Sequence, residues 1–444
     1  MTLTTGQPNG HQKIRTKTPQ SAGGIRRSRW SRLGMFLGPG LIAAFAGNDA
    51  GGIATYAQAG AQWKYDFIWL MVLITFSLII VQEMCARMGA VTGKGLADLI
   101  REKFGFRWTL FAIAAILIAN GGTVVSEFAG IAAALEIFKI KPYVSIPLMA
   151  LLLWWIAVKG SSARVNTIFL ILCAGFVVYI PAAFMGKPLN WGELVHATWH
   201  PHFYLRTPGY LLAVLALIGT TITPYMQIYL QTSVAQKGVT AAEYPRSQKW
   251  DTIMGCILGD LISVVIIIAT AKVLFAGPGK FTIDTADQAA RALAPVVGVW
   301  AEYLFAAGLF GASMLAAAVV PLATAYFICE AIGWQSDVSS DFEDAKAFYF
   351  IFSGILVIGA AVALIPNLPL MQLLVIVQAI EGCMLPILLV FIMLLINDPE
   401  IMPVLRNSKL FNLSAWTTTI VIGLIALAYV IATVILPRFG INLG

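Results

Sequence analysis

The chain of 444 residues is 59% hydrophobic and only 11% charged, with a mean hydropathy of +0.81. Soluble globular domains carry about 25% charged residues, so this composition excludes that class and predicts an integral membrane protein. The formal net charge of +7 does not indicate a nucleic-acid partner, because the basic residues lie in short segments between apolar runs, where they set membrane orientation.

Residues 1–32 contain no apolar run. They are rich in Gly, Thr and Ser and carry scattered basic side chains, namely Lys13, Arg15, Lys17, Arg26, Arg27, Arg29 and Arg32. Such a segment buries too little apolar surface to fold by itself. It also lacks the apolar core of a cleaved signal peptide. We therefore predict a disordered cytosolic tail.

Residues 33–440 form the predicted membrane domain. Runs of about 20 apolar residues, the length that crosses roughly 30 Å of hydrocarbon, predict eleven helical spans and hence an all-α integral membrane protein. The spans begin near residues 33, 66, 108, 142, 163, 208, 252, 293, 345, 369 and 412. Because the number is odd, the two termini are predicted on opposite sides of the membrane.

Basic residues gather on one side of these spans. They occur in the tail and in the loops after spans two, four, six and ten, at Lys94, Arg101, Lys103, Arg107, Lys159, Arg164, Lys237, Arg246, Lys249, Arg406 and Lys409. The loop after span eight, around residues 337–344, is acidic, but acidic residues weigh little in the positive-inside rule. We expect a plasma-membrane protein with a cytosolic N-terminus and an external C-terminus.

The first span contains Asp49, which stands in the sequence Gly47-Asn48-Asp49-Ala50-Gly51-Gly52 between two apolar halves. A carboxylate near the bilayer centre costs roughly 2.5 to 3.5 kcal/mol, so it persists where it binds something or where water reaches it. The glycines let the helix unwind and free backbone carbonyls for coordination. This pattern predicts a cation site in a broken span.

A second interrupted span runs from Leu217 to Gln227, where Pro224 removes a helix donor within an apolar run. It is the sixth span, so the breaks occupy the first positions of two five-span halves. This pattern is typical of inverted repeats with the substrate site between the breaks. We place the repeats at about 33–184 and 207–396, with an additional helix at about 411–437.

Taken together, these residues resemble the Nramp family of divalent-metal transporters. The resemblance runs from Gly38 to about Arg406 and is carried by Gly38-Pro39-Gly40, Asp49, Gln58-Ala59-Gly60-Ala61, residues 86–94, Gln378, Leu385-Pro386 and Asn397-Asp398. Each element is weak alone, but their order and spacing are specific. The resemblance implies an eleven-span, LeuT-type 5+5 inverted repeat with broken helices 1 and 6.

Three departures from the family pattern indicate the transported ion. The family has Asp-Pro-Gly-Asn in its first span, whereas this chain has Gly52 in place of the asparagine ligand. The family has Met-Pro-His in its sixth span, whereas this chain has Thr223-Pro224-Tyr225. Loss of a thioether removes a preference for softer metals, and a missing side chain leaves room for the waters that Mg²⁺ retains. The combination resembles the Nramp-related magnesium transporters.

The sequence contains few of the titratable side chains that a proton relay through the membrane needs. The four histidines, His11, His196, His200 and His202, lie outside the apolar spans. The acid that the family carries three residues before its third-span glutamate would fall at Val124, although Glu127 remains, and span nine lacks the family's basic pair. We therefore predict transport without obligatory proton coupling.

The predicted metal site comprises Asp49, the carbonyls of Ala46 and Thr220, the hydroxyl of Thr223, the space at Gly52, and Gln378. Residues expected behind the ligands or at a gate are Tyr225, Glu381, Asp260, Asn48 and Glu127. Structural alternatives stay open for several of them. The Thr223 hydroxyl could bond back to its own helix, and Gln378 and Glu381 could form hydrogen bonds between helices. Tyr225 could have only a packing role. Glu127 could be a packing acid or a residual proton site.

The sequence predicts an alternating-access importer of partly hydrated Mg²⁺, and also Mn²⁺, with no cofactor. The first alternative is a proton-coupled Mn²⁺ or Fe²⁺ importer. A sodium-coupled carrier of organic solutes is disfavoured because Asp49 would repel a substrate carboxylate. A membrane enzyme or metal sensor is disfavoured because no nucleophile motif, His/Cys metal motif, phosphate loop or sizeable soluble domain is present. Oligomeric state is left open, with a monomer expected.

Overall fold

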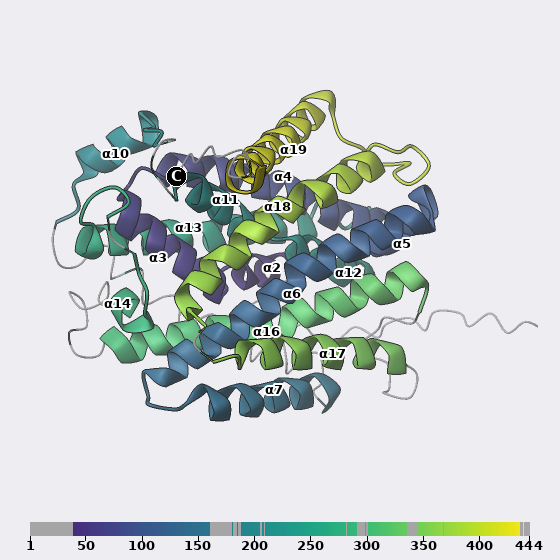
Figure 1. The fold of residues 1–444 in the computed structure, drawn as a ribbon. Helices are drawn as coiled ribbons and strands as arrows, with labels where there is room; N and C mark the ends of the chain where they lie inside the picture. The colour runs from purple at the N-terminus through teal and green to yellow at the C-terminus, as the bar shows by residue number, and fades with distance from the viewer. Residues whose placement is uncertain are drawn as a thin grey trace, which may run out of the picture. The chain divides into compact units, whose positions relative to one another are not determined.

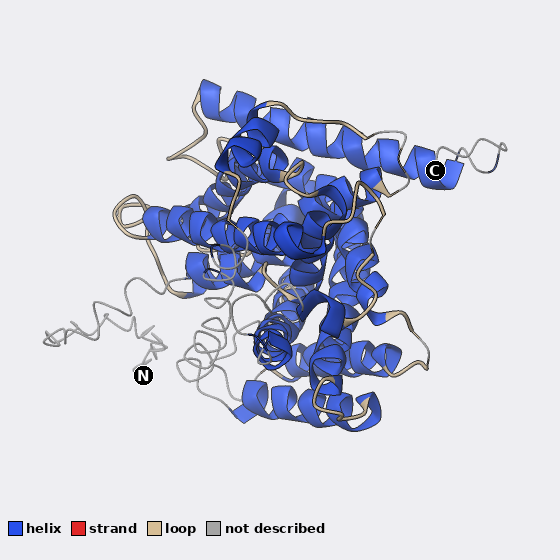
Figure 2. Cartoon of the chain, turned by 90° about the vertical axis from the view of Figure 1, so that its left-hand side faces the viewer, coloured by secondary structure: helices blue, strands red, loops and turns tan. Residues whose placement is uncertain are grey.

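A computed structural model describes residues 39–159, 188–204, 209–280, 282–290, 301–334, 345–366 and 368–435, together with a few single positions. Within these ranges the chain is helical and contains no strand, which fits the all-α expectation (Figures 1 and 2). The predicted tail at 1–32, the predicted fifth span near 163–184 and the acidic loop at 337–344 lie outside the described residues.

The helices follow the predicted spans in order. They are α2 (Pro39–Ala46), α3 (Ala50–Trp63), α4 (Ile68–Thr92), α5 (Leu96–Phe104), α6 (Phe106–Glu136), α7 (Pro142–Lys159), α10 (Trp191–Trp199), α11 (Tyr210–Thr221), α12 (Pro224–Gln236), α13 (Gln248–Leu274), α14 (Ala286–Ala290), α16 (Ala301–Ile332), α17 (Lys346–Ala363), α18 (Leu370–Ile396), and α19 (Lys409–Val430) with a π-helical end at Ile431–Ile435.

Eight helical segments in the described part of the chain are long and apolar enough to cross a membrane. They are α4, α6, the α11–α12 pair, α13, α16, α17, α18 and α19. The predicted first span is present as the two short helices α2 and α3, and the predicted fourth as the shorter α7. These helices account for every predicted span except the fifth.

Both predicted breaks are present. The first span stops at Ala46 and restarts at Ala50, and the sixth stops at Thr221 and restarts at Pro224. Proline suits the first position of α12 because its missing N–H has no partner within a helix anyway. Asp49 caps the start of α3 with its side chain, whereas Thr223 makes no side-chain cap bond at the start of α12.

The broken spans lie in the middle of the bundle. In the span formed by α11 and α12, 83% of the most apolar 18-residue stretch is buried inside the bundle. In the α19 span the corresponding share is 22%. Figure 1 shows α19 and α7 at opposite sides of the described helices, with α3, α18 and α6 between them. The bundle thus encloses the two breaks and leaves α19 at its edge.

Close backbone contact fixes α11 against α18. A Cβ atom built on Gly219 would lie 2.0 Å from the carbonyl oxygen of Gln378 and 2.5 Å from the backbone nitrogen of Gly382. Only glycine permits this approach, and it sets the end of α11 directly beside Gln378.

We expect Gly219→Ala to lower stability by about 1 to 3 kcal/mol, because the added methyl group overpacks against backbone that cannot rotate away. The measurement is the melting temperature of the detergent-purified protein. Gly121→Ala in α6 is the matched control, since a Cβ there meets nothing within 4 Å. Equal melting temperatures for the two variants would contradict the close contact.

Candidate metal-binding site

Asp49 caps the restarted half of the first span. Its side chain is fully buried, and its Oδ1 accepts a hydrogen bond of 2.6 Å from the backbone N–H of Gly52. A carboxylate at a helix N-terminus satisfies an unpaired donor and interacts favourably with the helix dipole. The break therefore positions the charge by local backbone geometry.

Tyr225 joins the two breaks. Its hydroxyl donates a 2.7 Å hydrogen bond to the carbonyl of Ala46 and lies 3.4 Å from Asp49 Oδ2. Because Tyr225 is in the first turn of α12, this contact links the second break to both ends of the first. The Ala46 carbonyl, which we predicted as a ligand, is paired with this hydroxyl in the present conformation.

Gly52 faces the same place. A Cβ atom at this position would lie 2.9 Å from the carbonyl oxygen of Gly47, 3.0 Å from Thr220 Oγ1 and 3.3 Å from Asp49 Oδ1. A longer side chain at position 52 would therefore project among these oxygens. In the present conformation these oxygens already lie too close to position 52 for a Cβ atom, so a side chain there would require them to move.

Several buried polar atoms around the breaks have no hydrogen-bond partner. They include the hydroxyls of Thr220 and Thr223 and both amide atoms of Gln378, whose Nε2 lies 1.8 Å from the Cβ position of Gly51. Leaving a buried polar atom unpaired costs about 1 to 3 kcal/mol, so such atoms indicate a missing partner such as water or a ligand. The Thr223 hydroxyl is not bonded back to its helix.

Glu127 provides a second cap at the first break. Its Oε2 accepts a 3.2 Å hydrogen bond from the backbone N–H of Ala50, and its Oε1 accepts one of 3.3 Å from Ser126. Two carboxylates from different helices thus bind the first N–H groups of α3. This geometry gives Glu127 a structural role in holding the break.

The other predicted residues point elsewhere. The Asn48 amide bonds to α13, donating to the carbonyl of Gly259 over 3.0 Å and accepting from Ser263 over 2.8 Å. Glu381 accepts a hydrogen bond from Thr123 of α6. Asp260 lies on α13 beside the Thr75 hydroxyl, with one oxygen unpaired. These three residues make no direct hydrogen bond to Asp49 among the described contacts.

The sequence interpretation missed Met226 as a neighbour of the site, and it missed the hydroxyl of Thr220. Thr220 was expected to offer its carbonyl, yet its hydroxyl also faces position 52. The Sδ atom of Met226 packs against Gly47, at 2.8 Å from its Cβ position. The spacing of Met226, three residues after Thr223, could have indicated a side chain on the same face of α12.

The donor set is dominated by oxygen. Among the described residues, no group of three His, Cys, Asp or Glu side chains could hold a metal ion. A cation at the breaks would therefore meet one carboxylate together with neutral carbonyl, hydroxyl and amide groups. Such a set suits a hard cation that keeps part of its water shell.

The comparisons with known proteins identify the family. The family model described as "Nramp: Natural resistance-associated macrophage protein-like" matches residues 40–432. The chain belongs to the Nramp family. A divalent metal cation transporter MntH from Ralstonia nicotianae is 26% identical over 423 residues, which cover 89% of this chain and 90% of the relative. A second MntH, from Chromohalobacter salexigens, is 27% identical over 324 residues, covering 68% and 71%.

Solved structures agree on the fold. The Eremococcus coleocola manganese transporter, crystallised with an aromatic bis-isothiourea substituted compound, superposes with a TM-score of 0.71 at 21% identity, covering 95% of this chain and 90% of that one. MhsT in complex with L-phenylalanine gives a TM-score of 0.57 at 15% identity, covering 91% and 99%. The predicted LeuT-type membrane fold is confirmed, while the number of spans stays a prediction.

We expect Glu127→Ala to lower stability by about 1 kcal/mol, because the N–H of Ala50 loses its cap. Glu127→Gln keeps a side-chain oxygen at the same reach and is expected to melt at the wild-type temperature. Thermal melting of both variants in detergent provides the measurement. If Glu127→Gln destabilised as much as Glu127→Ala, the charge and not the hydrogen bond would be what holds the break.

Proposed function

We propose that this protein imports divalent cations, foremost partly hydrated Mg²⁺ and also Mn²⁺, by alternating access. The observation that carries the proposal is the fully buried Asp49 at the junction of two broken spans, beside unpaired buried hydroxyls from the second break. A buried carboxylate in a membrane protein marks an ion pathway when neutral ligands surround it. Here they come from both breaks, as expected for a substrate site of this fold.

The ligands follow from these contacts. Asp49 supplies the charge, and the hydroxyls of Thr220 and Thr223 and the amide of Gln378 supply neutral groups without a competing partner. The Ala46 carbonyl becomes available when the Tyr225 hydroxyl leaves it, which gives Tyr225 the role of a gate between an empty and a loaded site.

Mg²⁺ fits this set better than a softer metal. It dehydrates reluctantly and is usually bound by one or two carboxylates with several waters retained. An asparagine at position 52 would direct its amide towards Asp49 and Thr220, whereas Gly52 adds no side-chain ligand that competes with retained waters. A threonine at position 223 offers oxygen, which does not favour transition metals over Mg²⁺.

Import does not require protons in this proposal. The acid expected by family resemblance three residues before Glu127 is Val124, which is buried and packs against Gly359 of α17, at 2.4 Å from the Cβ position of that glycine. An apolar contact therefore fills the place where a relay would pass. A negative-inside potential supplies roughly 2.3 kcal/mol per charge per 100 mV, or about twice that for a dication.

The proposal includes the orientation of the protein in the membrane and its cellular location. The basic loops after the even-numbered spans favour a cytosolic N-terminus and an external C-terminus. The same side includes Lys94, Arg101 and Lys103, which flank or lie in the amphipathic helix α5. We infer a monomeric plasma-membrane protein with no enzymatic activity.

A proton-coupled Mn²⁺ or Fe²⁺ importer is the second candidate. It is favoured by the sulfur of Met226, which packs against Gly47 at the first break, since thioether ligands prefer softer metals. The MntH relatives and the manganese transporter structure add weight to it. The two candidates differ in ion preference and in proton movement, so one experiment separates them.

We expect proteoliposomes containing the wild type to take up Mg²⁺ and Mn²⁺ without acidifying, because Val124 stands where the family resemblance places an acid of the proton relay. Asp49→Ala is expected to abolish uptake of both ions, because no other charged ligand remains. Uptake is followed with ion-sensitive dyes and an internal pH dye. Met226→Leu is the control for the sulfur and is expected to keep Mg²⁺ uptake. Uptake of Mn²⁺ alone with acidification would overturn the Mg²⁺ proposal and establish the second candidate.

We expect Gly52→Asn combined with Thr223→Met to shift selectivity from Mg²⁺ towards Mn²⁺ by roughly tenfold or more, because the pair adds an amide ligand and a soft thioether ligand beside Asp49. The ratio of initial uptake rates for the two ions measures the shift. Gly121→Ala, where the added methyl group meets nothing within 4 Å, serves as the control. An unchanged ratio in a folded double variant would show that these positions do not set selectivity.

A further inference from the structure

One face of the short helix α10 carries three side chains of the kinds that bind metals. Glu193, His196 and His200 follow one another at intervals of three and four residues, so they lie along one side of the helix. The backbone N–H of His200 donates to the carbonyl of His196 over 2.8 Å, which closes the last turn and holds the two histidines one turn apart. In the proposed orientation this helix, which precedes the sixth span, lies on the external side.

The two imidazole rings on this face are paired. Their centroids are 4.4 Å apart, their planes lie within 14° of parallel, and both residues are exposed. Imidazole is a ligand that suits Zn²⁺, Cu²⁺ and Ni²⁺. Two histidines four residues apart on one helix face can bind a single zinc ion. Two histidines alone do not form a His/Cys metal motif, and only the helix places them on one face.

Glu193, the third member of the face, is held by a cation of the protein itself. Its Oε1 binds the Lys64 ammonium, which also lies over the rings of Tyr65 and Phe275, at 5.6 and 5.7 Å from their centroids. Lys64 has a φ of 57°, in a region that residues other than glycine rarely adopt. Because Glu193 is engaged, the described residues form no cluster of three metal ligands in the present conformation.

A cavity of about 270 Å³ lies beside these groups. Its lining includes Glu193 and His196 of α10, together with Asp66 and His202. The last two already face each other, with 3.8 Å between His202 Nδ1 and Asp66 Oδ1, and Asp66 Oδ2 also accepts a 2.7 Å hydrogen bond from Tyr204. The cavity therefore has room for an ion with its waters next to α10, while His202 has a carboxylate partner of its own.

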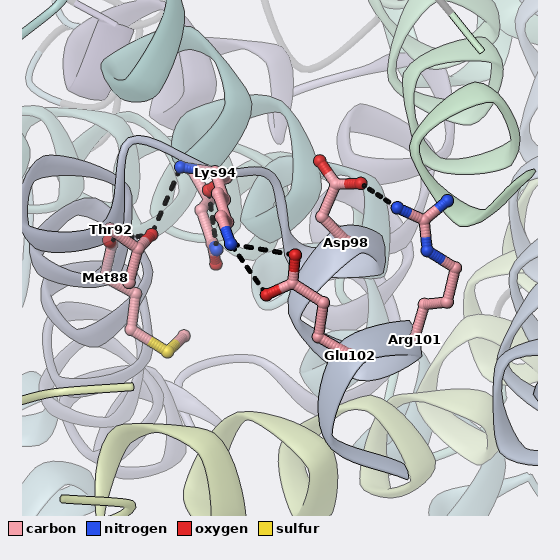
Figure 3. A network of polar contacts seen from close by, with 7 residues as sticks. Met88, Thr92, Lys94, Asp98, Arg101 and Glu102 are labelled. Carbon is pink, nitrogen blue, oxygen red and sulfur yellow. Dashed lines mark hydrogen bonds and ion pairs between the residues drawn. The ribbon is translucent and has the colours of Figure 1, made fainter. Parts of the chain in front are cut away.

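A charged helix elsewhere in the structure lacks these features. Figure 3 shows the short helix α5, where Glu102 binds the Lys94 Nζ at 2.7 and 2.8 Å and Asp98 pairs with Arg101 at 3.2 Å. The helix contains no histidine, and each of these carboxylates meets a basic side chain. Surface ion pairs of this kind need no ligand to explain them. On α10 a stacked histidine pair stands beside the carboxylate.

We propose that the α10 face formed by Glu193, His196 and His200 is a second metal site, which binds a transition-metal ion such as Zn²⁺ in preference to Mg²⁺. The two imidazoles make the first contacts, and water completes the coordination. Glu193 becomes the third ligand when it leaves Lys64, so the metal ion and the Lys64 ammonium compete for one carboxylate. The inference goes beyond the proposed function, because these nitrogen donors differ in kind from the oxygen donors at the breaks.

Zn²⁺ titration in a calorimeter tests the site without relying on transport. The protein is purified in detergent without a histidine tag and carries Asp49→Ala, which removes the charge of the proposed site at the breaks. We expect one Zn²⁺ to bind per chain in the presence of excess Mg²⁺. Adding His196→Ala or His200→Ala is expected to weaken binding roughly tenfold or more, because one imidazole remains.

His202→Ala is the matched control. It removes a third exposed histidine from the same cavity but leaves the α10 face intact, so Zn²⁺ affinity is expected to stay unchanged. Zn²⁺ affinity that is the same in His196→Ala, His200→Ala and the parent protein would overturn the site. Because the parent carries Asp49→Ala, Zn²⁺ binding on α10 can succeed or fail independently of the proposed Mg²⁺ transport.

Removing the competing cation tests the role of Glu193. We expect Lys64→Gln to tighten Zn²⁺ binding roughly threefold or more, because the freed carboxylate joins the two imidazoles. Lys94→Gln is the matched control, since it breaks an exposed ion pair with Glu102 away from α10, and is expected to leave Zn²⁺ affinity unchanged. A merely structural Lys64–Glu193 pair predicts equal or weaker binding in Lys64→Gln, and that result would rule out Glu193 as a ligand.

Discussion

The hydrogen bond from the Gly52 N–H to Asp49 is the constraint on which the rest of the structure depends. It fixes a buried carboxylate at the start of α3, and Glu127 supports the same helix end from α6. A membrane interior offers no water to satisfy these donors. In the break of the first span these two acidic side chains replace missing helical hydrogen bonds, and in the proposed function Asp49 also supplies the charge that holds the cation.

The second break is joined to the first by a hydrogen bond. Tyr225 reaches from α12 to the Ala46 carbonyl, so the two breaks are joined by one hydroxyl in this conformation. The Thr223 hydroxyl, one helical register from Gln227 and Gln231, remains unpaired. α12 therefore begins at the proposed ligands.

Much of the backbone arrangement at the two breaks could be predicted from the sequence. Glycines around Asp49 and the proline at position 224 predicted both breaks, because each residue disrupts helical hydrogen bonding by itself. Partners across the bundle were not predictable. Nothing in the sequence assigns Glu127 to the N–H of Ala50, or turns Asn48 towards α13, because these contacts join residues far apart in the chain.

The sequence by itself determined the membrane class, the order of the apolar spans, the two breaks and the buried acid, since these depend on composition and on properties of single residues. Only the tertiary structure decided which side chains surround that acid. Gln378 lies against Gly51 because Gly219 lets α11 and α18 touch. Such contacts depend on packing between helices, which periodicity along one chain segment does not encode.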